Sequence, residues 1–196
     1  MSNCFVLGCE ESGEAVIIDA GELVPEIKRY IEENSLSVKY IILTHSHVDH
    51  AGDIGRFKEA TGAQIVVHED EEPLYANLAE QARMFGFSLD SPPPADVLAR
   101  HGDELCFGAG VRLGLIHCPG HSPGGMSILC DNTVFVGDTL FAGSIGRTDL
   151  PGGDYRTLIT VIKSRILALG DAIQVLPGHG PATSVATERR YNPFLA

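Results

Sequence analysis

The chain has 196 residues, of which 44% are hydrophobic and 20% are charged, a composition typical of an ordinary soluble globular protein. We expect residues 1–196 to form a single domain with a substantial hydrophobic core. The formal net charge of −12 argues against nucleic-acid and anionic-membrane partners, which require a basic surface.

The five cysteines include no C-x-x-C pair, and we see no signal-peptide pattern before the first strand-like segment. No apolar run approaches the roughly 18 residues of a membrane span. We therefore expect reduced thiols and a cytoplasmic location. Cys118 lies three residues before His121; we expect a small buried side chain there, with a metal ligand or nucleophile as the less favoured alternative.

Short apolar runs predict strands in both halves of the chain. The predicted strands are Cys4–Leu7, Ala15–Asp19, Val38–Leu43, Ala63–Val67, Glu104–Phe107, Val111–His117, Met126–Cys130, Thr133–Val136 and Ile173–Leu176. Apolar residues at helical spacing predict helices between them. These are a helix ending near Asn34, the segments Ile54–Ala60 and Leu74–Met84, and a helix from about Tyr155 to Leu169. The alternation of strands and helices indicates an α/β layered domain.

Two short segments lie at the end of the third predicted helix and after it. Met84 and Phe85 near its end are expected in the hydrophobic core. The segment Asp90–Ala95 contains three consecutive prolines and is expected to be an extended surface connection. A hinge for a lid over the site is the less favoured alternative for this segment.

The most distinctive segment is Thr44–His50, which follows an apolar strand and has the sequence T-H-S-H-V-D-H. Imidazole and carboxylate groups are ligands for zinc, iron and manganese. A hydrophobic core would not bury four such groups without partners, because their desolvation is costly. The spacing therefore predicts a metal site rather than a His-rich surface loop.

Three further candidates also follow apolar strands and lie among glycines. They are His121 in P-G-H-S-P-G-G, Asp138 in V-G-D and His179 in P-G-H-G. Strand ends at one edge of a sheet are where α/β proteins build ligand sites, and glycine lets the backbone approach such a site closely. We expect these three side chains to join the His-rich segment.

The remaining histidines considered, His68, His101 and His117, lie away from these motifs. We expect them to be structural. His117 is the candidate among them for a hydrogen-bonding partner of a ligand.

Taken together, T-H-x-H-x-D-H, P-G-H, G-D and G-H-G occur in the order found in the metallo-β-lactamase superfamily. The chain resembles its glyoxalase II-like (hydroxyacylglutathione hydrolase) branch, in the compact prokaryotic form, from Asn3–Leu7 to Asn192–Phe194. The resemblance implies an αββα sandwich of two facing mixed sheets with helices outside and metals in a cleft along one edge. It also implies that the C-terminal helical domain of full-length glyoxalase II is absent.

The resemblance implies a role for each motif residue. His45, His47 and His121 would bind a first divalent metal ion, Asp49, His50 and His179 a second, and Asp138 would bridge both. Zinc is the first choice, with iron or manganese as alternatives. Two ions about 3.5–4 Å apart can lower the pKa of a bound water and polarise a carbonyl. Asp49 would also orient or deprotonate that water, so Asp49 and Asp138 are the catalytic candidates.

The implied reaction is hydrolysis of a small-molecule thioester, of the S-2-hydroxyacylglutathione (S-lactoylglutathione) type, by attack of a metal-bound hydroxide. A thiolate leaves with a pKa of about 8–9, so no strong general acid is required. Gly146–Asp149 replaces the family's Gly-Lys-Phe-Tyr stretch. Arg147 is a candidate to bind a glutathione carboxylate, and a salt bridge to Asp149 or Asp154 is an equal alternative.

Other classes remain open. A persulfide dioxygenase on this scaffold would use a single iron on His45, His121 and Asp138. A lactone or ester hydrolase would use the same two metals, and a metal-stabilised binding domain would need no open site. The complete dinuclear ligand set favours the hydrolase, and the sequence leaves the oligomeric state undetermined.

Overall fold

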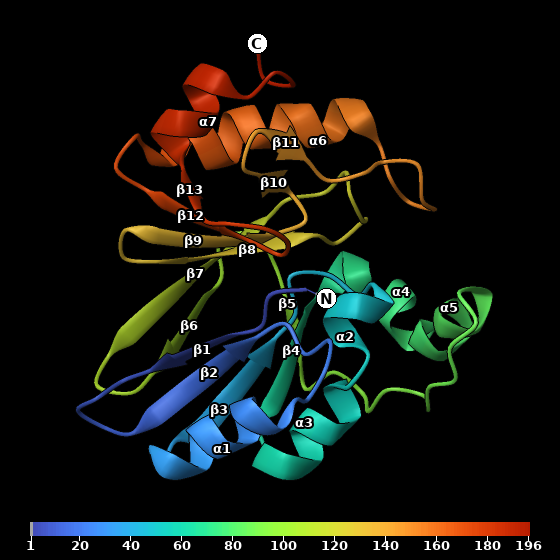
Figure 1. Cartoon of the computed structure of the whole chain (residues 1–196), viewed down its shortest axis with the longest axis vertical. Helices are drawn as coiled ribbons and strands as arrows, with labels where there is room; N and C mark the ends of the chain where they lie inside the picture. Colours follow the sequence, from blue (N-terminus) through green and yellow to red (C-terminus); the bar gives the residue numbers. More distant parts are fainter. Residues whose placement is uncertain (1) are drawn as a thin grey trace.

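The computed structural model describes residues 2–196, and within them two large β-sheets face each other between layers of helices (Figure 1). The first sheet, from the N-terminal half, has the order β1-β2-β3-β4-β5. Its strands are β1 (Phe5–Gly8), β2 (Glu14–Ile18), β3 (Ser37–Ile42), β4 (Gln64–His68) and β5 (Val97–Ala99). β1 is antiparallel to β2, whereas β2 to β5 are parallel.

The second sheet has the order β13-β12-β9-β8-β7-β6. Its strands are β6 (Glu104–Phe107), β7 (Val111–His117), β8 (Met126–Cys130), β9 (Thr133–Gly137), β12 (Gln174–Pro177) and β13 (Thr183–Ser184). A small hairpin, β10 (Leu140–Phe141) and β11 (Ser144–Ile145), follows β9. The parallel pairing of β9 with β12 brings the ends of these two strands to one edge of the sheet.

Helices cover the outer faces of both sheets (Figure 1). The first sheet carries α1 (Pro25–Glu33) and α3 (Ile54–Thr61), with α2 (Val48–Ala51), η1 (Glu69–Glu71), α4 (Glu72–Ala76) and α5 (Leu78–Met84) beside it. The second sheet carries α6 (Tyr155–Val161), its continuation through the π-helical η2 (Ile162–Ile166) and η3 (Leu167–Leu169), and α7 (Val185–Tyr191). The predicted αββα sandwich is confirmed.

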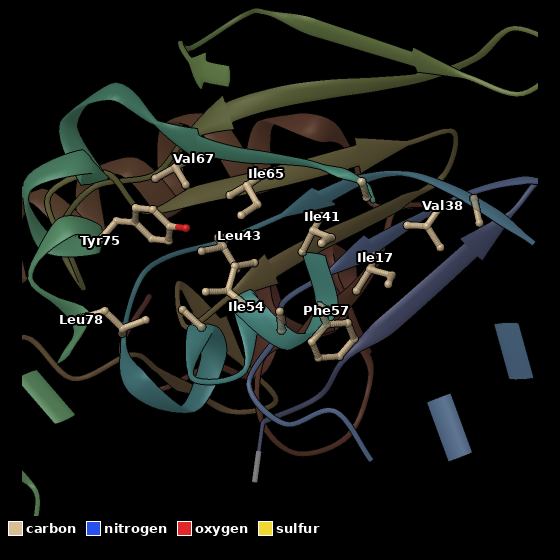
Figure 2. Close-up of a cluster of buried hydrophobic side chains, with 14 residues drawn as sticks. Ile17, Val38, Ile41, Leu43, Ile54, Phe57, Ile65, Val67, Tyr75 and Leu78 are labelled. Atoms are coloured by element: carbon tan, nitrogen blue, oxygen red, sulfur yellow. The ribbon is translucent and has the colours of Figure 1, made fainter. Parts of the chain in front are cut away.

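Alternating side chains of the first sheet build two cores, because successive residues of a strand point to opposite faces. Val16 and Ile18 pack against the second sheet, whereas Ile17 packs toward the helices. Figure 2 shows Ile17 near Phe57 of α3 in this outer core, where both are fully buried. Ile42 at the end of β3 and Ile54 at the start of α3 are also buried, so the segment between these two elements is fixed at both ends.

All of the predicted strands are present, and their ends differ from the prediction by at most one residue. The sequence did not reveal β5, β10, β11, β13, α2 or α7. Most of these elements are too short to show a period. The start of α7 did carry a signal, because the Ser184 hydroxyl caps the helix by accepting from the Thr187 N–H.

The prediction of one helix over Leu74–Met84 was wrong. The helix is interrupted at Asn77, whose backbone leaves the helical region and whose side chain donates to the carbonyl of Pro73. Met84 and Phe85, expected in the core, are 77% and 55% exposed because they lie beyond the buried face of α5. The predicted helix from Tyr155 is continuous in outline but changes its hydrogen-bonding pattern after Val161.

The proline-rich segment matches its prediction. It lies within residues 87–95, which contain no helix or strand. The Tyr75 hydroxyl donates to the Pro93 carbonyl at 2.6 Å, which fixes the segment against α4. Among residues 2–196, no helix has the length and apolar character needed to cross a bilayer.

Candidate metal centre

Four of the predicted ligands lie in the segment that leaves β3 and enters α3. The strand ends in the core, so His45 follows it as a fully buried side chain. The short helix α2 then brings His50 back against His45, with ring centroids 4.1 Å apart. One short segment can therefore supply ligands on two sides of the same point.

The other predicted ligands come from the second sheet. His121 lies in the loop between β7 and β8, Asp138 directly follows β9, and His179 follows β12. Because β9 and β12 are parallel neighbours, Asp138 and His179 leave the sheet at the same edge. The structure thus brings all seven predicted ligands together from the facing edges of the two sheets.

Three histidines form a first cluster with their ring nitrogens facing one another. Nε2 of His121 lies 2.9 Å from Nδ1 of His47 and 3.2 Å from Nε2 of His45. His47 therefore uses a different ring nitrogen from the other two. These three residues are one of the groups in the structure that can hold a metal ion.

A second cluster contains Asp49, His50 and His179. Nε2 of His179 lies 3.0 Å from Oδ2 of Asp49 and 3.3 Å from Nε2 of His50. Asp49 is half-exposed at the surface of the site, whereas His50 is fully buried. This arrangement offers two nitrogens and one carboxylate to a single small volume.

Asp138 lies between the two clusters. Its Oδ1 is 3.3 Å from Nε2 of His50, and its Oδ2 is 3.6 Å from Nε2 of both His121 and His179. Oδ1 is buried and has no hydrogen-bond partner among residues 2–196. A buried carboxylate oxygen in this state fits a cation ligand, because its desolvation otherwise lacks compensation.

The spacing of the donor atoms is close to what a metal ion requires. Two nitrogens bound at 2.0–2.1 Å to a tetrahedral zinc lie about 3.3 Å apart. The nitrogen pairs of the first cluster, at 2.9 and 3.2 Å, and the pair of the second cluster, at 3.3 Å, are close to this value. The residues present therefore fit a metal centre in both spacing and donor type.

Hydrogen bonds on the far side of two rings fix their orientation. His50 donates from Nδ1 to Oδ2 of Asp19 at 2.8 Å, and His121 donates from Nδ1 to the carbonyl of Arg147 at 2.8 Å. Each ring then points an unprotonated Nε2 toward the centre when a metal binds. Sequence reasoning missed Asp19. The available signal was its position at the end of a predicted strand, within I-I-D-A-G. In the structure its backbone adopts a positive φ of 62°.

Two buried side chains and one partly buried side chain anchor the backbone of the ligand segment. Asp19 accepts from the Thr44 N–H, and Glu71 accepts from the Ser46 N–H. Gln81 accepts from the Val48 N–H and donates to the Ser46 carbonyl. The segment is therefore positioned by β2, η1 and α5 together.

Glu71 also reaches the loop that carries His121. One of its carboxylate oxygens accepts from Ser46 N–H at 2.8 Å, and the other accepts from Gly124 N–H at 2.7 Å. A Cβ at Gly124 would lie 2.2 Å from the backbone nitrogen of Glu71, so only glycine permits this approach. Burial raises the pKa of the Glu71 carboxyl despite these hydrogen bonds. Glu71 thereby links two ligand-bearing segments.

The histidines of the centre differ in proton affinity. Burial and neighbouring histidine charges lower the pKa of His47 to about 4 and lower that of His45 well below its usual range. Burial also lowers the pKa of His121, against the opposing effect of Asp138. Burial alone would lower the pKa of His50, but Asp19 and Asp138 outweigh it and raise the value to about 10. The first cluster is therefore neutral and ready to bind a cation at neutral pH.

The centre opens into a cleft of about 1090 Å³. His47, Asp49, His121, Asp138 and His179 all line it. A cleft of this size beside a candidate metal centre can admit a small molecule.

Arg147 lies in the wall of this cleft. Its guanidinium forms two hydrogen bonds of 2.7 Å with the carboxylate of Asp149. This interaction lowers the pKa of Asp149 to about 2. The salt bridge considered from the sequence is present, and the Arg147 carbonyl also orients His121.

The histidines expected to be structural form a separate group. The rings of His68 and His117 stack with centroids 3.8 Å apart, and His101 accepts from the His117 N–H. His117 donates from Nε2 to the Pro123 carbonyl rather than to a candidate ligand. Cys118 is buried in the core beneath α6, and burial raises the pKa of its thiol to about 11. Its thiol is thus protonated and packed, as expected.

Comparisons with known proteins agree with this architecture. A profile of the metallo-beta-lactamase superfamily matches residues 1–179. Hydroxyacylglutathione hydrolase GloC of Haemophilus influenzae is 39% identical over 197 residues, covering 98% of this chain and 92% of the relative. The crystal structure of BLEG-1 B3 metallo-beta-lactamase superposes with a TM-score of 0.91 at 34% identity, covering 100% of this chain and 94% of the other.

A second solved structure bears on the metal. TTHA1623 in a di-iron-bound form superposes with a TM-score of 0.88 at 36% identity and covers 100% of this chain and 96% of the other. The family profile, the αββα arrangement and the histidine–aspartate clusters agree with one another. The chain therefore belongs to the metallo-beta-lactamase superfamily, in its glyoxalase II-like branch.

Proposed function

We propose that this protein is a dinuclear metal-dependent hydrolase of thioesters, with S-2-hydroxyacylglutathiones such as S-lactoylglutathione as substrates. The observation that carries the proposal is the position of Asp138, whose oxygens lie within 3.6 Å of ring nitrogens from both clusters. A carboxylate in this position can bridge two ions. The 39% identity to a hydroxyacylglutathione hydrolase supports the substrate class.

The proposed ligand assignment follows the two clusters. The first ion would be held by His45, His47 and His121, the second by Asp49, His50 and His179, and both by Asp138. Zinc is our first choice, and iron or manganese would accept the same donors. The di-iron form of TTHA1623 supports iron as the alternative.

The chain's own residues would prepare the attack on the thioester. When bound, the ions would supply Lewis acidity, which lowers the pKa of a water molecule and polarises the substrate carbonyl. The half-exposed Asp49 would orient this water and accept its proton, because its Oδ2 faces the second cluster at the cleft. The departing thiolate needs no strong general acid, because the pKa of its thiol is about 8–9. Arg147 would bind a glutathione carboxylate by releasing Asp149, so that one carboxylate partner replaces another.

Metal analysis combined with two activity assays tests the proposal. We expect two metal ions per chain and hydrolysis of S-lactoylglutathione that is lost on chelation and restored by metal. Persulfide-dependent oxygen uptake by a protein with one iron per chain would overturn the proposal in favour of a dioxygenase. Hydrolysis of a lactone or oxygen ester without any thioester hydrolysis would contradict the substrate class.

A further inference from the structure

The cleft beside the metal centre is lined by residues from both halves of the chain. Arg147 and Leu150 come from the second half. Together with polar residues such as Glu22, Asp53 and Gln81, the first half of the chain contributes to the same cleft a group of apolar side chains. We name it the apolar wall, and it consists of Val24, Ile27, Val48, Phe85, Phe87 and Leu89.

Two aromatic side chains dominate the exposed part of the apolar wall. Phe85 and Phe87 are 55% and 59% exposed although they are large hydrophobic residues. Exposed aromatic groups that line a cleft at a reactive centre are typical of a ligand-binding surface. Both residues lie just beyond α5, which ends at Met84.

The apolar wall is joined to the metal centre. Val48 separates two candidate ligands, His47 and Asp49, and itself belongs to the wall. Gln81 on α5 holds the Val48 N–H at 2.9 Å and the Ser46 carbonyl at 3.1 Å. Phe85, the C-cap residue of α5, follows Gln81 by four residues, and both residues line the cleft. The apolar wall and the candidate ligands therefore line one cleft.

The two arginines that line the cleft are each paired with an aspartate. Arg56 lines the cleft, but its guanidinium contacts Asp53 at 2.8 Å. Arg147, from the second half of the chain, is held by Asp149. The apolar wall therefore offers hydrophobic contact without a free guanidinium, which favours an uncharged apolar group.

We propose that the apolar wall binds the acyl group of the substrate and selects thioesters with a large apolar acyl group over those with a small one. This inference rests on the proposed thioester hydrolase function. The acyl carbon reacts at the metal centre, so the group attached to it lies within reach of Val48 and the two phenylalanines. Burying an aryl group there adds contact that a methyl group cannot make.

S-Mandeloylglutathione and S-lactoylglutathione form a matched pair of test substrates, because they differ only by phenyl in place of methyl. We expect kcat/KM of the wild-type protein to be about tenfold higher for the mandeloyl substrate. In the double variant Phe85→Ala/Phe87→Ala, the ratio of the two kcat/KM values should fall toward one, mainly through KM. Tyr191→Ala, which removes an exposed aromatic ring outside the cleft, should leave the ratio unchanged.

Binding of the free acids to the metal-loaded protein separates this inference from the hydrolase function. By calorimetry, mandelate should bind about tenfold more tightly than lactate, and the double variant should lose this difference. Equal binding of the two acids, or an unchanged preference in the double variant, would overturn the proposed acyl-binding role of the apolar wall, whether or not thioesters are hydrolysed. Absence of hydrolysis with mandelate selectivity intact would contradict only the proposed reaction.

Discussion

Asp138 lies between the two clusters of candidate ligands. It lies outside the His-rich segment Thr44–His50, and its oxygens approach ring nitrogens of both clusters. Burial alone would raise the pKa of the Asp138 carboxyl, but the neighbouring His50, with Nε2 3.3 Å from Oδ1, outweighs it and lowers the value. The carboxylate is therefore ionised and able to balance cationic charge.

Replacing Asp138 with asparagine should remove this balance while keeping the side-chain shape. We expect Asp138→Asn to hold one metal ion or fewer per chain and to lose at least about 100-fold in activity, since even ligand-supporting residues contribute 10–100-fold. Metal analysis and thioester hydrolysis measure both effects. Asp131→Asn is the control, because Asp131 is exposed in a turn whose positive φ asparagine tolerates. Full metal content and activity in Asp138→Asn would refute a bridging role.

Glu71 acts through the backbone of the segments that carry the ligands. Glu71→Gln leaves either Ser46 N–H or Gly124 N–H without an anionic acceptor, at a cost of about 1–3 kcal/mol. We expect a lower Tm and about tenfold weaker metal binding, measured by thermal unfolding and chelator competition. Glu72→Gln, at an exposed neighbour, serves as the control. Unchanged metal affinity in Glu71→Gln would show that the two segments are positioned without it.

At the scale of elements, strand ends and glycines position the centre. β9 and β12 run parallel, so the residues that follow them emerge together. Gly178 then passes so close to the centre that a Cβ would lie 2.4 Å from Oδ1 of Asp138 and 2.6 Å from Cε1 of His50. The turn after β12 is thus part of the packing around the second cluster.

A methyl group at Gly178 should disturb the second cluster selectively. We expect Gly178→Ala to weaken binding of one of two metal ions at least tenfold, because Asp138 and His50 must move apart. Gly180→Ala is the matched control, since Gly180 has a φ of 75° but open space around its Cα. That variant should lose only about 1 kcal/mol of stability through backbone strain. Equal metal affinities in the two variants would contradict the steric explanation.

The hydrophobic pattern predicted the strands of four or more residues to within one residue at each end, whereas the helices beside the cleft were predicted less well. A four-residue apolar spacing ran through Asn77, but the side chain of Asn77 binds the Pro73 carbonyl and interrupts the helix. Phe85 looked like a core residue because an apolar side chain carries no information about whether a partner surface exists. Local pattern therefore predicted element type, and tertiary packing decided which faces were covered.

For the whole molecule, burial of several histidines in one centre links folding to pH. His45, His47 and His121 have lowered pKa values, so between pH 6.5 and about 4 the unfolded chain binds protons that the folded chain does not. Stability contributed by their neutral forms is present above pH 6.5 and is lost as the pH falls through this window. His50, with its raised pKa of about 10, is protonated in both states at the lower end of the window.

The metal-free protein should accordingly lose stability on acidification. Each proton taken up on unfolding changes the free energy of unfolding by about 1.4 kcal/mol per pH unit. His47→Gln removes one such group, so its free energy of unfolding should depend less steeply on pH between 6.5 and 4. Urea unfolding of chelator-treated protein at several pH values measures the slope. Identical slopes in the variant and the wild-type protein would contradict the lowered pKa of His47.

The sequence by itself determined the chemistry of the centre, since His, Asp and Gly motifs named all seven residues that the structure brings together. It also determined the layered fold, because the period of apolar residues distinguishes strands from helices. Only the tertiary structure decided the supports and the cleft. Glu71 and Gln81 bind backbone groups far away in the sequence, and Phe85, just after the end of α5, lines the cleft. Such contacts depend on how segments distant in the sequence pack together, which no local pattern encodes.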